Sequence, residues 1–415
     1  MRSIKLIGFT ILSLFSIVSF GQEQIGFKLK QGVRRMEIPF ERYNNLVVIP
    51  VTLKDQITLN FILDTGVQNT ILTDRIYADL LGLDYNREVI IRGPGQNDSI
   101  KVFVVDNIDM SVAKIQGKNT PMIVLEEDFL KLSNNLGAQV HGIIGYELFK
   151  HFVIEVDFDD KKIIFHDPKK FRRRKYYKQR YFERIPMTVE RRKPYVSARI
   201  AQKDGDKANV KLMVDTGASH AVLLNPTTHN KISVPEEHLS SLLGRGLGGE
   251  IFGLVGRIDN IKINRFEFDD VVVFYPNEQH YGYGLRSGDR NGTIGGELLS
   301  HFNYVINYPD GWLYLRESDE FERTFEFDLS GLEIISFGNQ YEMVMVKDVR
   351  EESPAWNAGV RRGDIIESIN GKDAQRTSLN FINALIRSKV GKRIFMRLKR
   401  GEEVVKVRFE LERLI

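Results

Sequence analysis

The chain is 415 residues long, with 42% hydrophobic residues, 27% charged residues and a formal net charge of +4. This composition is typical of a soluble globular protein with two or three domains. The small net charge gives no overall field that would attract a polyanion. The chain contains no cysteine, which excludes disulfides, a thiol nucleophile, a thiolate metal site and a lipid-attachment cysteine.

The N-terminus has the pattern of a secretory signal peptide. Arg2 and Lys5 precede an apolar stretch at residues 6–20, and small residues lie around a cut before Gln22. The stretch is too short, and too often interrupted by polar residues, for a good membrane span. We therefore expect residues 1–21 to be removed and the protein to be exported, either periplasmic or secreted. An uncleaved membrane anchor is the alternative, and no other segment could cross a bilayer.

The chain contains two copies of one sequence unit. Each unit has a strand-like run, then an apolar segment ending in Asp-Thr-Gly, at residues 64–66 and 215–217. Each closes on an apolar element ending in Gly and then on His-Phe, at residues 142–152 and 292–302. The spacing between these motifs is almost the same in both units, which indicates an internal duplication.

Both units consist of short runs of Val, Ile, Phe and Tyr separated by turn residues, so we expect mainly β-structure. Short helices are predicted at residues 74–81 and 296–300. The connector at residues 169–184 is rich in Lys and Arg. It is interpreted as a solvated linker, and the alternative is a contact with anionic lipid, polysaccharide or nucleic acid.

The paired Asp-Thr-Gly sequences suit hydrolysis of a peptide bond without a metal. One carboxylate can take a proton from water, while a second, protonated carboxyl can hydrogen-bond the substrate carbonyl. Two carboxyls held close together supply both states, because their charges resist double ionisation. Asp64 and Asp215 are the predicted catalytic pair, and this reasoning assigns neither role to either residue.

The neighbouring residues suit such a site. Thr65 and Thr216 can anchor the two loops through hydroxyl hydrogen bonds. Gly66 and Gly217 leave space for backbone N–H groups to face the carboxylates. The alternative is a pair of purely structural turns in which each Asp caps the end of a strand.

On these motifs, residues 36–317 resemble the retropepsin and pepsin clan of aspartic proteases. The resemblance implies two tandem retropepsin-like β-barrel lobes, residues 22–168 and 185–317, related by pseudo-twofold symmetry. It implies that Asp64 and Asp215 form the dyad, that Thr65 and Thr216 brace it, and that the apolar elements ending in Gly support the loops. It also implies flaps that close over substrate, at Gly93, Gly95, Gly244 and Gly246, and no metal or cofactor.

The first loop departs from the family pattern. It continues as Val67-Gln68-Asn69, whereas the second continues as Ala218-Ser219. Gln68 could hinder substrate or alter the hydrogen bonding of the dyad. Two alternatives therefore stay open: a non-catalytic peptide-binding scaffold with degenerate lobes, and a homodimer in which each lobe pairs with a second chain.

Other chemistries find less support. The eight histidines show no metal-ligand spacing, and the chain has no GxSxG nucleophile elbow. Residues 244–249 match GxGxxG, but no βαβ unit supports a dinucleotide site. His151 and His301 recur at equivalent positions beside apolar residues, and we expect both to be structural.

The C-terminal region, residues 318–415, resembles a bacterial PDZ domain of α+β type. The resemblance rests on the sequences at residues 353–360, 363–366 and 369–371. Strands are predicted at 343–349, 394–398 and 404–411, and a helix at 378–388. The resemblance implies that a peptide C-terminus adds as a strand beside that helix and a loop. The loop residues are Gly331, Leu332, Glu333 and Ile334.

Glu333 would be an awkward neighbour for a peptide carboxylate, and a PDZ fold that only docks on the lobes is the alternative. Taken together, the sequence predicts an exported aspartic endopeptidase that acts on peptides or proteins as a monomer. Its PDZ domain would bind a ligand peptide. We expect no nucleic-acid partner and no integral membrane segment after signal removal.

Overall fold

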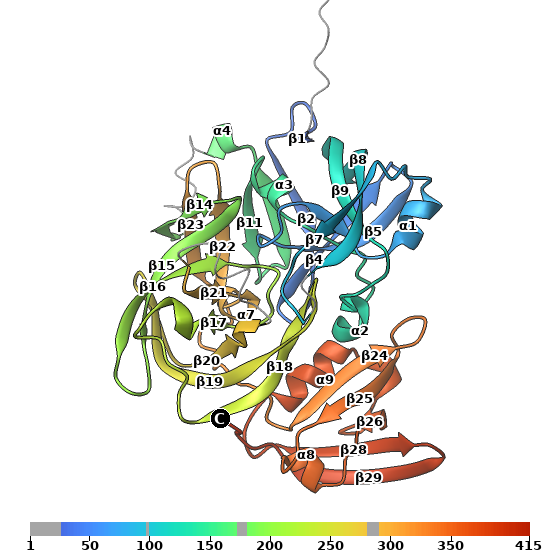
Figure 1. Cartoon of the computed structure of the whole chain (residues 1–415), viewed down its shortest axis with the longest axis vertical. Coiled ribbons are helices and arrows are strands. Elements are labelled where there is room, and N and C mark those ends of the chain that lie inside the picture. The colour runs from blue at the N-terminus through green and yellow to red at the C-terminus, as the bar shows by residue number, and fades with distance from the viewer. Residues whose placement is uncertain (1–25, 97–98, 172–180, 280–289) are drawn as a thin grey trace, which may run out of the picture.

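The computed structural model describes residues 26–96, 99–171, 181–279 and 290–415. Over these residues the chain is mainly β, as predicted, and forms four sheets with a few short helices (Figure 1). The predicted signal peptide and most of the basic connector, residues 172–180, lie outside the described residues. Within the described ranges, no helix is long and apolar enough to cross a membrane.

Lobe 1 is built on a nine-stranded sheet with the order β1-β9-β6-β10-β5-β4-β8-β7, in which β3 pairs with β4 and β8 also pairs with β9. The helices of this lobe are α1 (Arg75–Leu80), α2 (Leu132–Leu136) and α3 (Tyr146–Phe149). Its strands are β1 (Gly26–Leu29), β3 (Glu41–Tyr43), β4 (Leu46–Leu53), β5 (Ile57–Leu63), β6 (Thr70–Leu72), β7 (Arg87–Ile91), β8 (Ile100–Val112), β9 (Ile115–Leu125) and β10 (Gly142–Ile144).

Lobe 2 is built on an eight-stranded sheet with the order β14-β15-β16-β21-β17-β20-β19-β18. It also contains a 3-10 helix, η1 (Pro226–Thr228), and α7 (Gly296–Leu299). Its strands are β14 (Thr188–Glu190), β15 (Lys193–Ala201), β16 (Lys207–Val214), β17 (Val222–Leu224), β18 (His238–Gly246), β19 (Gly249–Ile263), β20 (Phe266–Pro276) and β21 (Gly292–Ile294).

The internal duplication predicted from the sequence recurs in the strand pairing. In lobe 1, β10 runs parallel to β5 and antiparallel to β6, and β6 runs parallel to β9. In lobe 2, β21 runs parallel to β16 and antiparallel to β17, and β17 runs parallel to β20. The same path of the chain therefore carries each Asp-Thr-Gly loop.

A six-stranded sheet joins the two lobes, in the order β13-β23-β22-β11-β12-β2. Lobe 1 supplies β2 (Arg35–Pro39), β11 (Val153–Asp157) and β12 (Lys162–His166), and α4 (Pro168–Phe171) follows. Lobe 2 supplies β13 (Glu183–Pro186), β22 (Phe302–Asn307) and β23 (Trp312–Glu317). The lobes meet where β11 pairs antiparallel with β22.

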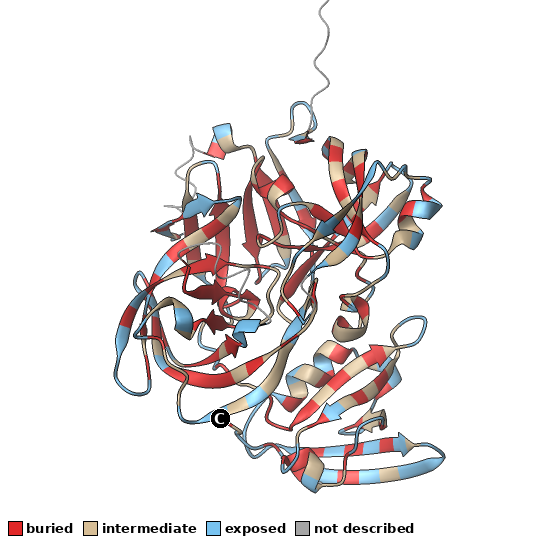
Figure 2. Ribbon diagram, viewed as in Figure 1, coloured by how far each residue is buried: buried red, intermediate tan, exposed pale blue. Residues whose placement is uncertain are grey.

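The main hydrophobic core runs through both lobes and the sheet between them. Every residue of β11 and β22 is buried, which shows that both faces of the joining sheet are covered (Figure 2). Burial of apolar side chains on both faces is what holds two separately folded sheets together as one body.

The C-terminal domain has its own core cluster and a sheet with the order β24-β25-β26-β28-β29, in which β27 pairs with β26. The predicted strands and the predicted helix all form. The elements are β24 (Leu332–Phe337), β25 (Met343–Val349), α8 (Pro354–Asn357), β26 (Ile365–Ile369), β27 (Lys372–Asp373), η2 (Ala374–Arg376), α9 (Leu379–Ile386), β28 (Arg393–Arg400) and β29 (Glu403–Glu410).

Arg257 of β19 ties the C-terminal domain to lobe 2. Its side chain is 6% exposed, and it donates to the backbone oxygens of Phe325, at 2.9 Å, and Ile415, at 3.0 Å. It also pairs with Glu326 and Asp270, each at 3.1 Å. Since Phe325 and Ile415 pack into the core of the lobes, both ends of the C-terminal domain are fixed to lobe 2.

We predict that Arg257→Leu loosens this attachment. The substitution leaves two buried backbone oxygens without a donor and removes a partner of Glu326, which should cost about 2 kcal/mol or more. Urea unfolding would measure the loss, and limited proteolysis would show cleavage between lobe 2 and the C-terminal domain.

Arg265→Leu is the matched control, because Arg265 is 57% exposed and its ion pairs with Glu183 and Glu317 are both 3.6 Å long. Exposed pairs contribute about 0–1 kcal/mol, so this variant should unfold like the parent protein. Equal losses in the two variants would contradict the anchoring role of Arg257.

Candidate active site

Two equivalent loops form the centre of the site. Strand β5 leads into Asp64, and strand β16 leads into Asp215. The backbone N–H of Asp64 donates to Ile144, and that of Asp215 donates to Ile294, both at 2.9 Å. The acceptors end β10 and β21, so the apolar elements predicted as supports do hold the two loops.

Thr65 and Thr216 lock the loops together by an exchange of hydrogen bonds. The backbone N–H of each donates to Oγ1 of the other, at 3.1 Å in both directions. Each hydroxyl in turn donates across the lobe boundary, Thr65 to Val214 at 2.6 Å and Thr216 to Leu63 at 2.7 Å. Both threonines are buried. Four hydrogen bonds therefore hold the two loops to each other.

The two carboxyl groups lie side by side. A Cβ placed on Gly66 would lie 2.9 Å from Oδ1 of Asp64 and 2.9 Å from Oδ1 of Asp215, and a Cβ on Gly217 would lie 2.6 Å from Oδ1 of Asp64. The backbone N–H groups of Gly66 and Gly217 donate to Asp64 and Asp215. Glycine is thus required at both positions, because any side chain would overlap the carboxylates.

The charge state of the pair is set by burial and by mutual repulsion. Burial raises the pKa of Asp64 well above its ordinary value of 3.8, the charge of Asp215 raises it further, and the hydrogen bond from Gly66 opposes both effects. The pair therefore keeps a proton at pH values where an isolated carboxyl is ionised. One protonated and one ionised carboxyl is the state that acid–base hydrolysis requires.

Sequence reasoning missed three titratable residues near the dyad. Burial raises the pKa of Tyr308, and both Asp64 and Asp215 add to the rise. Burial lowers the pKa of Lys193, although the negative charges of Asp215 and Asp64 act to raise it. Burial also lowers the pKa of His220 to about 4, against the pull of Asp215, so this imidazole is neutral over most of the accessible pH range.

The irregular first loop is accommodated by a contact between the lobes. Gln68 is exposed, and its amide donates to the backbone oxygen of Arg191 at 3.1 Å. At the equivalent place in the other lobe, the amide of Asn45 donates to the backbone oxygen of Ser219, also at 3.1 Å. Each Asp-Thr-Gly loop therefore contacts the opposite lobe, through the amide of Gln68 in the first loop and the carbonyl of Ser219 in the second, and Gln68 also lines the same cavity as Asp64.

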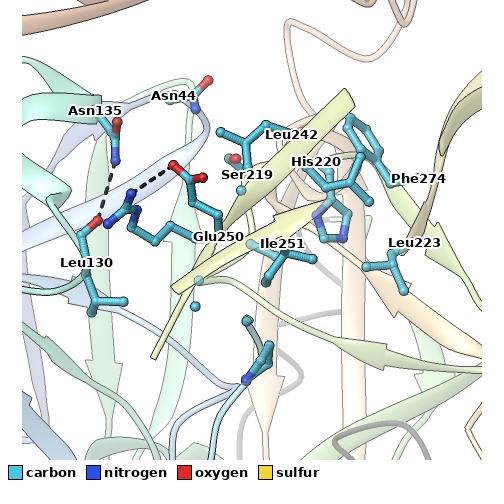
Figure 3. A pocket seen from close by; sticks show the side chains of 18 of the residues that line it. Asn44, Leu130, Asn135, Ser219, His220, Leu223, Leu242, Glu250, Ile251 and Phe274 are labelled. Atoms are coloured by element: carbon cyan, nitrogen blue, oxygen red, sulfur yellow. Dashed lines mark hydrogen bonds and ion pairs between the residues drawn. The ribbon is translucent and has the colours of Figure 1, made fainter. Parts of the chain in front are cut away.

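The dyad opens into a cavity of about 1470 Å³ that is lined by both lobes and by the C-terminal domain. Figure 3 shows part of this lining, where Leu130 and Asn135 of lobe 1 lie across from Glu250 and Ile251 of lobe 2. The cavity also reaches the four predicted peptide-binding residues, Gly331, Leu332, Glu333 and Ile334. No sequence motif predicts that these residues and the dyad share one cavity.

The predicted flaps meet above the dyad. The long β18–β19 hairpin of lobe 2 crosses to lobe 1 (Figure 1), and the backbone N–H of Gly248 donates to Pro94 at 2.8 Å. Three of the four predicted flap glycines, Gly93, Gly95 and Gly246, lie at this contact, where an added Cβ would overlap the opposite tip. Gly244 lies at an irregularity in β18 instead. The tips of the two flaps are therefore in direct contact across the cleft.

The predicted peptide-binding loop carries a compensated charge. Glu333, which the sequence marked as awkward for a peptide carboxylate, pairs with Lys347 at 2.6 Å. Gly331 has a positive φ of 83°, a conformation that glycine adopts readily. Across the described part of the chain, no group of three or more His, Cys, Asp or Glu side chains could hold a metal ion.

Two solved structures align with parts of the chain at low sequence identity. Basic 7S globulin from soybean aligns with 71% of this chain and 98% of its own, at 8% identity and a TM-score of 0.41. The photosystem II D1 C-terminal processing protease aligns with 20% of this chain and 22% of its own, at 24% identity and a TM-score of 0.19. No curated protein matches the chain.

Family models match three stretches of the chain. Residues 49–148 and residues 196–297 each match the aspartyl protease family, and each match contains one Asp-Thr-Gly loop. Residues 345–400 match the PDZ domain. The chain is therefore a tandem aspartyl protease-family protein with a C-terminal PDZ domain.

Proposed function

We propose that this protein is an exported aspartic endopeptidase, in which Asp64 and Asp215 activate one water molecule. The observation that carries the proposal is the pair of adjoining carboxyl groups, braced by Thr65 and Thr216 beneath closed flaps. Export rests on the signal-like pattern of residues 1–21.

The proposed reaction needs only the dyad and water. The ionised carboxyl accepts a proton from water while the oxygen of that water attacks the peptide carbonyl carbon. The protonated carboxyl hydrogen-bonds the carbonyl oxygen and stabilises the charge that develops there. The amide nitrogen then takes a proton as the C–N bond breaks, and the products are one carboxylic acid and one amine.

The dimensions of the cavity favour a polypeptide substrate. Sites for small molecules usually measure about 300–1,000 Å³, whereas this cavity measures about 1470 Å³ and extends along both lobes to the PDZ domain. The flap tips enclose a bound chain and exclude water from the dyad. A peptide or protein substrate fits this shape, and a PDZ domain is suited to binding a second peptide segment.

We predict that Asp215→Asn lowers peptide hydrolysis by about a thousandfold or more, because a general acid–base group and the dyad's negative charge are both lost. Cleavage of a quenched fluorescent peptide library would measure the loss. Circular dichroism should show an unchanged fold.

Asp79→Asn is the matched control, since it makes the same change at an exposed carboxylate of lobe 1 that does not line the cavity. This variant should retain hydrolysis. Full activity in Asp215→Asn would contradict the proposal, and an inert parent protein that still binds peptides would support the scaffold alternative.

We predict that Asp64→Asn makes the folded protein more stable at about pH 7.5 but not at about pH 4. The folded-state pKa of Asp64 is raised above 3.8, so the stability gained from its proton is complete below that pH. It is lost as the pH rises through the folded-state pKa. Asn carries no charge, so the stability of the variant does not fall with rising pH in this way. Thermal unfolding across the pH range would measure the difference in stability between the variant and the parent protein.

Asp79→Asn serves as the control with the opposite sign. A hydrogen bond from Tyr85 lowers the pKa of Asp79, so ionised Asp79 favours the folded state above the unfolded pKa. Its replacement should give no gain at neutral pH. A flat difference between Asp64→Asn and the parent protein at all pH values would contradict the buried, repelling pair.

A further inference from the structure

Strand β24 lies at the outer edge of the PDZ sheet, and part of its backbone faces away from β25. Val346 of β25 directs its backbone toward β26, since it accepts from Gly363 and donates to Asp364, both at 2.8 Å. Its partner on β24 is Ile334, so Ile334 turns its own N–H and C=O away from β25. Ser336, the next residue but one, is oriented in the same way. Such an edge accepts an added strand.

A helix of lobe 1 occupies this edge. Asn134 of α2 donates through Nδ2 to the backbone oxygen of Ser336 at 2.9 Å. Gly137, at the end of α2, lies against α9, because a Cβ placed there would lie 2.5 Å from Cβ of Leu379 and 3.1 Å from Oγ of Ser336. Figure 1 shows α2 directly beside β24 and α9. The end of the groove at Ser336 and Leu379 is therefore covered by lobe 1, whereas the end at the Gly331 loop opens into the cavity.

A second contact holds the other wall of the groove. The backbone N–H of Asn44 donates to Oδ1 of Asn380 on α9 at 3.1 Å, and Asn380 donates to the backbone oxygen of Arg42 at 3.5 Å. The opposite face of α9 is buried in the PDZ core. Lobe 1 therefore contacts α9 through hydrogen bonds to Asn380, and it contacts β24 through α2.

The same network reaches the flap of lobe 2. Lys347, the partner of Glu333, also lies 4.0 Å from Glu250 on the flap strand β19. Arg245 on the other flap strand pairs with Glu250 at 2.9 Å and donates to the backbone oxygen of Phe129 at 3.1 Å. Phe129 lies shortly before α2 in the chain. Groove, flap and α2 are therefore linked by direct polar contacts.

We propose that the groove between β24 and α9 is a self-occupied peptide site that controls access to the cleft. In the closed state, α2 covers the end of the groove at Ser336 and Leu379 and leaves no room there for an extended peptide. The C-terminal segment of a polypeptide, extended along β24 with its carboxylate at the loop of Gly331 to Glu333, displaces α2 and releases the flap. The control of cleavage rests on the proposed protease function, whereas the competition between α2 and the peptide does not.

This competition has a thermodynamic signature. A site that is open in only a fraction of molecules binds its ligand more weakly by that fraction, so loosening α2 must strengthen peptide binding. Gly137→Ala tests this, because the added Cβ meets Leu379. Gly82→Ala is the matched control: Gly82 also follows a helix of lobe 1 with a positive φ, 57° against 65°, and no atom lies within 4 Å of its added Cβ.

Binding is measured in an Asp215→Asn background, which removes any dependence on cleavage. The probes are fluorescein-labelled decapeptides that end in Val, Leu or Phe with a free carboxylate, and the same peptides with an amidated C-terminus. We expect Gly137→Ala to bind the free-carboxylate peptides about fivefold more tightly or better than Gly82→Ala, and amidated peptides to bind weakly. Asn134→Ala removes the hydrogen bond to Ser336 and should also strengthen the binding of free-carboxylate peptides. It provides the same test if Gly137→Ala fails to fold.

Equal affinities in Gly137→Ala, Asn134→Ala and Gly82→Ala would overturn the proposal, as would the absence of binding in every variant. Neither result bears on the Asp215→Asn test of hydrolysis. Conversely, an inactive parent protein whose groove variants still bind more tightly would reject the protease function and keep the competition.

A reversible lock tests the control of the cleft. The chain contains no cysteine, so Asn44→Cys combined with Asn380→Cys introduces the only two thiols, at a contact between lobe 1 and α9. The oxidised protein should lose the rise in hydrolysis that free-carboxylate peptides cause, and dithiothreitol should restore it. The two single variants are the controls. An undiminished rise in the oxidised protein would overturn the gating role of the groove.

Discussion

The exchange of hydrogen bonds between Thr65 and Thr216 is the constraint on which the rest of the site depends. It joins two loops that belong to different lobes, and it does so in a buried place where an unpaired hydroxyl or N–H would cost about 1–3 kcal/mol. Because the four bonds fix one loop against the other, they also fix the separation of the two carboxyl groups. The raised pKa of Asp64, which needs both burial and a neighbouring charge, follows from that separation.

The residues of this centre could be singled out from the sequence because their signals are local. Asp64 and Asp215 each begin an Asp-Thr-Gly tripeptide. The threonine hydroxyl forms the hydrogen bonds between the loops, and the glycine has no side chain that would overlap the carboxylates. Lys193 and Tyr308 lacked such a signal, since they approach the dyad only after segments distant in the chain have packed. His220 follows Asp215 on the same loop, but its burial depends on the packing of the folded lobe. The joining sheet was foreseen only as strand-like runs, because its order depends on pairing between the lobes. Gln68 suggested a defect, and only the position of Arg191 shows that its amide bridges the lobes.

The PDZ domain was predicted as a separate module, and its core is indeed separate. In the folded protein, however, the domain contacts both lobes. Arg257 fixes both ends of the domain to lobe 2, α2 and Asn44 hold it to lobe 1, and its peptide loop lines the same cavity as the dyad. Movement of one lobe relative to the other would therefore have to break contacts of this domain, and the flap residue Glu250 lies 4.0 Å from its Lys347. Residue types alone do not encode such a relation, because it arises from surfaces that meet once each domain has folded.

The pairing of β11 with β22 also bears on how the chain reaches its folded state. Half of the joining sheet comes from residues made early and half from residues made late, so β11 presents an unpaired edge until the hairpin of β22 and β23 arrives. Contacts between such distant parts of a chain form slowly, and an apolar strand edge that waits for its partner invites pairing with other molecules. Every residue of β11 is apolar or buried in the finished protein. The feature that unites the two lobes therefore makes the half-made protein prone to aggregation, and it favours a fast-forming lobe 2 or a chaperone that covers this edge.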